Sequence, residues 1–156
     1  MKFLLLSFGK AHEPYVKDGV EDFTRRIGRY NPVSWTILPP PKNAASLSVA
    51  DYKKKEAETL LARLEKDDYL VCLDERGQML TSEKFAGFIG ARTNESIKRL
   101  VFLIGGTYGI DQQVLQKAKF TWSLSALVFP HQLVRLILAE QLYRACSILA
   151  NEKYHH

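Results

Sequence analysis

Two short, almost uninterrupted apolar runs place the strongest constraint on the fold of this chain. They are YLVCLD at residues 69–74 and LVFLIGG at residues 100–106. A strand with one face in water alternates apolar and polar residues, whereas a parallel strand covered on both faces is apolar throughout. Segments with helical spacing, such as Val16, Val20 and Ile27, alternate with apolar runs of this kind along the chain. This alternation predicts an α/β fold with a mainly parallel sheet and helices on both faces.

The same patterns predict the other elements. The expected order is strand 2–8, helix 14–27, strand 33–38, helix 48–64, strand 69–74, helix 82–92, strand 100–106, helix 111–119, strand 122–125 and a helix from Pro130. The proline-rich stretch at 39–46 is too short to separate domains. We therefore expect a single domain over residues 1–156.

Composition excludes several classes of protein. The chain is 46% hydrophobic and 25% charged, which is ordinary for a globular domain. No apolar run approaches the ~18 residues of a membrane span, and the start MKFLLLSFGK has no cleavage site. Cys72 and Cys146 lie in apolar contexts, so we expect reduced, buried thiols and a cytoplasmic location without membrane contact. No Cys/His cluster has metal-site spacing, so no metal is expected.

The net charge of +5 favours a polyanionic partner. The basic residues gather at Arg25, Arg26 and Arg29 and again at Lys53–Lys55. Each group is a candidate contact for nucleic-acid phosphate, although a single cluster of this kind is more often a solvated helix face.

Three strand ends are candidates for a ligand site, since ligands of parallel sheets bind beyond the carboxyl ends of strands. They are Leu73-Asp74-Glu75, Ile104-Gly105-Gly106 and the segment WSLSALVFPHQLVR at 122–135. Gly105, Gly106 and Gly109 suit a tight turn close to a ligand, although a purely structural turn explains them as well. They match neither the dinucleotide fingerprint nor a P-loop.

The helix from Pro130 has apolar residues on every side. A helix of this kind is buried all round, and one sheet covers only one face. We therefore expect the other face to meet a second copy of the chain in a homodimer; the alternative is a central helix within one domain.

Polar residues on this helix form two pairs at i,i+4 spacing. His131 and Arg135 lie at the helix start beside the strand ends, where anions are attracted. Glu140 and Arg144 are placed for an ion pair. The tail residues Tyr154 and His155 either fold back over a neighbouring pocket or fray, as most tails do.

The combination of LIGGTYG, WSLSALVFPHQLVRLILAEQLYRA and a terminal YH resembles one family over essentially the whole chain. It is the family of ribosomal RNA large-subunit pseudouridine N3-methyltransferases, small members of the SPOUT or α/β-knot superfamily. The resemblance implies a homodimer with a C-terminal trefoil knot. It also implies a methyltransferase that uses S-adenosylmethionine on N3 of a pseudouridine in a stem-loop, helix 69, of 23S ribosomal RNA in the assembled 70S ribosome.

The resemblance also implies site residues. The cofactor-binding positions are Leu73, Gly105, Leu124, Ser125, Ala126, Leu127, Val128 and Phe129. The candidate catalytic residues are His155, Tyr154, Arg144, His131 and Arg135. The histidines and the tyrosine are candidates for taking the N3 proton, and the arginines for neutralising phosphate or the developing anion.

Two rival functions remain open from the sequence. One is a non-catalytic ribosome- or RNA-binding protein of the same fold, against which the intact glycines and the unbroken 124–129 segment argue. The other is a SPOUT methyltransferase acting on transfer RNA. Such relatives usually carry additional RNA-binding segments, for which this compact chain has no room.

Overall fold

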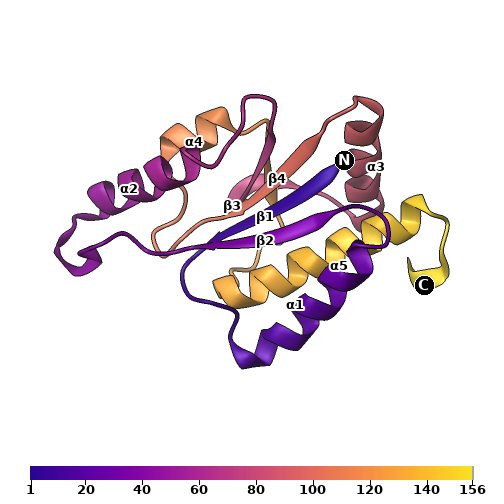
Figure 1. Ribbon diagram of the computed structural model, residues 1–156, viewed down its shortest axis with the longest axis horizontal. Coiled ribbons are helices and arrows are strands. Elements are labelled where there is room, and N and C mark those ends of the chain that lie inside the picture. The colour runs from indigo at the N-terminus through magenta and orange to yellow at the C-terminus, as the bar shows by residue number, and fades with distance from the viewer. Residues whose placement is uncertain (156) are drawn as a thin grey trace.

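The computed structural model describes residues 1–155, with the side chain of His155 outside the described part. The elements in chain order are β1 (Lys2–Phe8), α1 (Pro14–Ile27), β2 (Val33–Leu38), the 3₁₀ helix η1 (Ala44–Ser46), α2 (Val49–Leu61), β3 (Tyr69–Met79), α3 (Ser82–Asn94), β4 (Arg99–Ile104), α4 (Gln112–Lys117), β5 (Phe120–Ser123), α5 (His131–Leu149) and the 3₁₀ helix η2 (Lys153–His155). The strands form one parallel sheet in the order β2-β1-β4-β3-β5. The predicted α/β fold with a parallel sheet is confirmed (Figure 1).

Helices cover both faces of the sheet. α1, α3 and α5 pack on one face and α2 and α4 on the other (Figure 1). In the first layer Phe85 of α3 stacks on Trp122 of β5, with ring centroids 4.1 Å apart. In the second layer Leu60 of α2 and Leu103 of β4 are buried together. This burial on both sides is the physical reason why the central strands are apolar at nearly every position.

Two predicted helix starts are confirmed by their capping hydrogen bonds. The Ser48 hydroxyl accepts from the Asp51 N–H at 3.1 Å, and the Asp111 carboxylate accepts from the Gln113 N–H at 2.8 Å. Each bond satisfies an N–H group that has no partner within the helix. Pro130 is the residue before α5, so that helix begins one position later than predicted.

Several predicted boundaries were wrong. The helix expected at 48–64 ends at Leu61, and the helix expected to reach residue 119 ends at Lys117. The Lys119 N–H instead donates to the Leu70 carbonyl at 2.8 Å. Because the chain already joins the sheet there, β5 spans 120–123 rather than 122–125.

β3 is longer than the apolar run that predicted it. It continues to Met79 through a shift in register between Leu73 and Gln78, after which Gln78 pairs with Trp122. Gly77 makes this possible, because a Cβ there would lie 2.6 Å from the backbone of Thr121. The irregular strand end, which the apolar pattern does not report, shapes the edge of the sheet beside the candidate site.

α5 packs against both α1 and α3, yet its burial is uneven. Leu138, Leu142 and Ala145 are buried against the sheet, whereas Leu133 and Ile137 stay partly exposed. The all-round burial expected of this helix is therefore not reached within one chain. None of the helices in residues 1–155 is both long and apolar enough to cross a membrane.

Candidate functional site

A cavity of about 480 Å³ lies at the carboxyl ends of β3, β4 and β5. Its wall is built from the segment after β3, the glycine turn after β4 and the irregular segment after β5, with Lys53 of α2 and the start of α5 at the rim. The strand ends predicted as ligand sites therefore meet in one crevice. They meet because parallel strands end at the same edge of a sheet.

The residues assigned by family resemblance to a cofactor come together at this cavity, with one exception. Ala126 does not line the wall. Those that line it are Leu73, Gly105, Leu124, Ser125, Leu127, Val128 and Phe129.

The two serines of the segment after β5 hold its irregular shape. The Ser123 hydroxyl donates to the Ser125 carbonyl at 3.0 Å, and the Ser125 hydroxyl accepts from the Leu127 N–H at 3.0 Å. These local bonds replace ladder bonds and let the chain leave the sheet. Leu127 and Val128 then lie at the mouth of the cavity with 69% and 80% of their surface exposed.

The first two glycines of the turn leave no room for a side chain. Gly105 and Gly106 are buried, and a Cβ on Gly105 would lie 2.7 Å from Cγ1 of Ile110. Gly109 adopts φ +80°, a conformation that favours glycine, and its N–H donates to the Gly106 carbonyl at 3.0 Å. The turn thus presents backbone to the cavity at close range.

One wall of the cavity carries charges of both signs. Arg76 donates to Asp74 through Nε at 2.8 Å and Nη2 at 2.9 Å, a bidentate pair. These hydrogen bonds are the main reason why the pKa of Asp74 lies below its usual value. Lys53 reaches the same cavity from α2. A ligand with both an acidic and a basic group meets complementary charges here.

His131 and Arg135 were predicted as one anion site, and the structure places them apart. His131 lies at the cavity rim, where partial burial of its ring, followed by the charge of Arg135, lowers the pKa of His131. Arg135 is 1% exposed and faces β1. Its guanidinium donates to Ser7 Oγ at 2.9 Å, the Lys10 carbonyl at 2.8 Å and the Phe8 carbonyl at 3.2 Å.

The far end of α5 carries a second cluster of predicted residues. Arg144 Nη2 lies 2.6 Å from Glu140 Oε1, which confirms the predicted ion pair. The Arg144 guanidinium lies 4.9 Å from the centroid of the Tyr154 ring, and the Tyr154 hydroxyl donates to Glu140 at 3.3 Å. Burial and then the charge of Glu140 raise the pKa of Tyr154, so it stays a neutral phenol. The side chain of His155 lies outside the described residues.

The two clusters lie at opposite ends of one helix. α5 has 19 residues between His131 and Leu149, which corresponds to about 27 Å at 1.5 Å per residue. The tail packs against the end that points away from the cavity (Figure 1). Within one chain, Arg144 and Tyr154 therefore do not reach a ligand in the cavity.

The sequence reasoning missed two groups near the cavity. Glu56 is only 4% exposed beneath the glycine turn. The sequence does contain a sign of this burial. Glu56 lies four residues from both Tyr52 and Leu60, on the helix face that is otherwise apolar. Trp122 lines the cavity, and its buried Nε1 has no hydrogen-bond acceptor among residues 1–155. No cluster of side chains suited to a metal ion occurs in this described part.

The chain was compared with known proteins. A sequence model of the family described as "Predicted SPOUT methyltransferase" matches residues 1–155. Two relatives named "Ribosomal RNA large subunit methyltransferase H" align over 100% of both chains, one from Trichlorobacter lovleyi at 44% identity and one from Cytophaga hutchinsonii at 42%. The solved structure of "a probable methylase family protein" from Haemophilus influenzae matches with a TM-score of 0.52 at 12% identity, covering 98% of this chain and 69% of that one. That last likeness concerns the fold alone.

Proposed function

The chain belongs to the SPOUT methyltransferase family, and from that premise we propose that it methylates N3 of a pseudouridine in helix 69 of 23S ribosomal RNA. S-adenosylmethionine is the proposed methyl donor, and the assembled 70S ribosome the substrate. The observation that carries the proposal is the crevice at the three strand ends, in a chain that aligns end to end with ribosomal RNA methyltransferases.

The cavity suits S-adenosylmethionine. Its volume lies within the ~300–1,000 Å³ typical of small-molecule sites. The glycine turn allows close backbone approach, the Asp74–Arg76 wall offers charges to an amino-acid end, and Trp122 holds an unpaired N–H donor. When bound, this cofactor supplies a sulfonium methyl group. The residues proposed to hold it are Leu73, Gly105 and the run 124–129, with Ala126 contributing through the shape of the run.

The reaction needs a proton taken from N3 of the base, because the imide nitrogen is protonated at neutral pH. His131 suits this task because its lowered pKa leaves the imidazole neutral and able to accept a proton. His155 is the other candidate, whereas the raised pKa of Tyr154 keeps it a neutral phenol that can orient the base but not take its proton. Arg144 offers a fixed positive charge for the anion that forms on the base. All three nitrogens of the Arg135 guanidinium donate hydrogen bonds to other parts of the protein. We therefore assign Arg135 a structural role instead of a catalytic one.

A homodimer brings the two clusters together. Because the tail and the cavity lie at opposite ends of α5, Arg144 and Tyr154 meet a cavity only when a second copy lies antiparallel along that helix. The partly exposed Leu133 and Ile137, which one chain leaves uncovered, support this arrangement. We propose a dimer in which each cavity receives the tail of the other copy.

The proposed knot also fits the path of the chain. After β5 at the edge of the sheet, the 124–129 segment leads back to α5, which packs between α1 and α3. The chain thus re-enters a layer that its earlier segments already enclose. This return path supports a trefoil knot in the C-terminal part.

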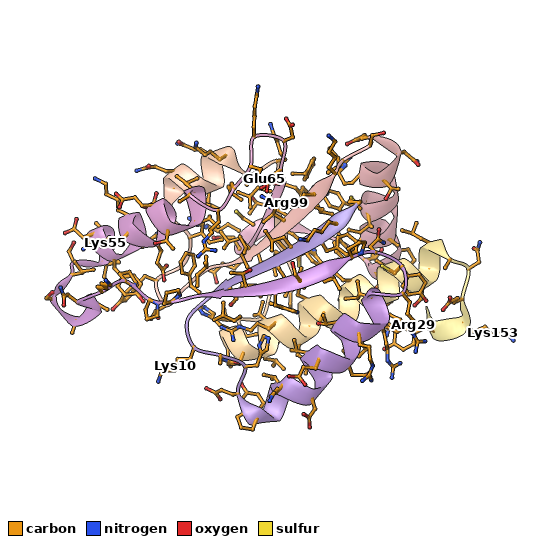
Figure 2. All side chains as sticks on the ribbon, in the orientation of Figure 1. Lys10, Arg29, Lys55, Glu65, Arg99 and Lys153 are labelled. Atoms are coloured by element: carbon orange, nitrogen blue, oxygen red, sulfur yellow. The ribbon has the colours of Figure 1, made fainter. Side chains whose placement is uncertain are left out.

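The proposed RNA contacts lie at both ends of the molecule. Figure 2 shows Lys55 on α2 at one end and Arg29 at the other, near Lys153 of the tail. Arg25 and Arg26 of α1 both pair with Asp22, whereas Arg29 forms no ion pair among the described residues. Across a dimer these groups would flank the cavity and hold phosphates.

The test uses ribosomes that lack the modification, the protein and radiolabelled S-adenosylmethionine. We expect label in 23S ribosomal RNA and a reverse-transcription stop next to the modified base, because a methyl group at N3 blocks pairing. Free transfer RNA serves as the competing substrate. Label only in transfer RNA would favour that rival function, and cofactor binding without any label would contradict the proposed reaction.

A further inference from the structure

Glu56 is a buried acid without a partner. It lies on the inner side of α2 between Tyr52 and Leu60, and only 4% of its surface is exposed. Among residues 1–155, no hydrogen bond or ion pair engages its carboxyl group. Acids are almost never buried in this way unless they are paired, and an unpaired one calls for a reason.

The carboxyl group lies directly beneath the glycine turn of the main cavity. A Cβ built on Gly106 would lie 2.2 Å from Glu56 Oε1, so the carboxyl occupies the place of the missing side chain. Glu56 also lines a small cavity together with Gly105, Gly109 and Ile110. Those three residues line the main cavity as well. The glycine turn is therefore a thin wall with the main cavity on one side and Glu56 on the other.

Among the described residues, no positive group pairs with the carboxyl from the elements around it. β1 and β4 contribute the apolar Phe8 and Leu103, and Asp111, which precedes α4, already caps that helix with its carboxylate. On α2 itself Lys53 turns to the main cavity. In these surroundings burial raises the pKa of Glu56 to about 7.

We expect the side chain of an ionised Glu56 to move out of its buried position towards water. A carboxylate without partners is costly in an apolar site, and the cost falls when the group reaches water. The glycine turn covers it, so exposing the group displaces the wall of the main cavity. A ligand that holds the wall in place therefore favours the neutral carboxyl, and by reciprocity the neutral carboxyl favours the ligand.

We propose that Glu56 is a positioning residue of the cofactor pocket, whose neutral carboxyl supports the Gly105–Gly109 turn and takes up a proton when the cofactor binds. This inference rests on the proposed function. It adds a residue that touches neither methyl donor nor RNA, and it makes cofactor affinity depend on pH above neutrality.

The test is calorimetric titration of the full chain with S-adenosylhomocysteine, at about pH 6.5 and about pH 8.5, in two buffers with different heats of ionisation. For the wild-type protein we expect proton uptake at the higher pH and an affinity weaker by about three- to tenfold there. Glu56→Gln is isosteric and always neutral, so we expect it to bind at both pH values with no uptake from this position. The ligand's own amino group titrates in both proteins, so their difference reports Glu56.

His131 is the other titratable group at the cavity that needs a control. Burial lowers the pKa of His131, so its ring is neutral at the higher pH, where His131→Asn should retain the proton uptake of the wild type. Equal uptake and equal pH dependence in wild type and Glu56→Gln would overturn the inference. So would loss of binding in a Glu56→Gln protein with native circular dichroism. A wild type that binds at neither pH would instead overturn the proposed function itself.

5′-Methylthioadenosine provides a check that needs no variant. It lacks the amino-acid end of the cofactor, and its adenine does not titrate near neutral pH, so any proton taken up on binding is taken up by the protein. Wild-type protein should take up a proton with this ligand at the higher pH. Binding without uptake would contradict the inference regardless of how Glu56→Gln folds.

Discussion

Arg135 and Ser7 join the last helix to the first strand in the interior of the molecule. Nε of Arg135 lies 2.9 Å from Ser7 Oγ, and neither residue is more than 1% exposed. The remaining donors of the guanidinium bind carbonyl groups at the end of β1 and in the loop that follows. The buried guanidinium of Arg135 therefore stabilises the contact between α5 and β1 and does not face a substrate.

Arg135→Met should therefore lower the free energy of unfolding by about 2–4 kcal/mol, because it leaves several buried polar groups without their charged partner. Urea denaturation at a fixed protein concentration measures this. Ser7→Ala is the matched control, with an expected loss of about 1 kcal/mol, since only one of these bonds disappears. Wild-type stability in Arg135→Met would contradict the structural role.

Arg144→Gln should show the opposite behaviour. The ion pair with Glu140 is partly solvated, so its loss should cost less than about 1 kcal/mol of stability. Methyl transfer to ribosomes should fall by about 100-fold or more, because a positive charge near the reacting base is lost. Lys66→Gln, a substitution of an exposed residue that belongs to neither cluster, is the control. Undiminished turnover in Arg144→Gln would remove this residue from the reaction.

Gly105→Ala should weaken cofactor binding by about tenfold or more while the protein stays folded, because close-packed walls do not absorb an added methyl group without shifting. The new Cβ would lie 2.7 Å from Ile110 and push the turn out of place. Gly87→Ala on α3 is the matched control, because no atom lies within 4 Å of its Cβ position. Titration with S-adenosylhomocysteine compares the two. Equal affinities would show that the turn does not shape the pocket.

Stability should depend on pH through Glu56. Its pKa is about 7 in the folded protein and near the ordinary glutamate value of 4.5 in the unfolded chain, so the folded state holds the extra proton between these values. Stability from this group is therefore lost as the pH rises through that window, by about 3 kcal/mol in total. Glu56→Gln should be more stable than wild type at about pH 8, with the difference shrinking towards about pH 4.5. Parallel curves for both proteins would contradict the raised pKa.

Mixed dimers test the proposed exchange of tails. A Gly105→Ala chain has a cavity that binds the cofactor weakly, and a chain without residues 154–156 lacks the tail. At a cofactor concentration too low to fill the weakened cavity, each should be nearly inactive alone, whereas co-expression of both should restore activity, because one site of the mixed dimer combines an intact cavity with an intact tail. No recovery in a mixed dimer whose formation is verified would place cavity and tail in the same chain.

The parallel sheet and its ligand edge were predictable from local patterns. Continuous apolar runs report strands covered on both faces, and strand ends then mark the crevice by topology. The Glu140–Arg144 pair was predictable too, because i,i+4 spacing on a helix brings side chains together without help from the rest of the fold. Capping residues predicted most element boundaries to within a few residues.

The misses share a cause. The extension of β3 to Met79 depends on its pairing with β5, a strand more than 40 positions further along. The i,i+4 spacing of His131 and Arg135 predicts that both lie on one side of α5. Arg135 instead hydrogen-bonds to Ser7 of β1 in the interior, and no pattern within α5 indicates this contact. Periodicity reports which face of an element is covered and does not identify what covers it.

By itself, then, the sequence determined the elements, the edge of the sheet where the cavity lies and, through resemblance, the family. Only the tertiary structure decided that Arg135 is a structural anchor, that Glu56 lies beneath Gly106 and that the tail of one chain lies far from its own cavity. The physical reason is the separation along the chain of the residues that interact. Local free energies depend on neighbours a few residues away, whereas these contacts join segments that meet only when the whole sheet and its helices have assembled.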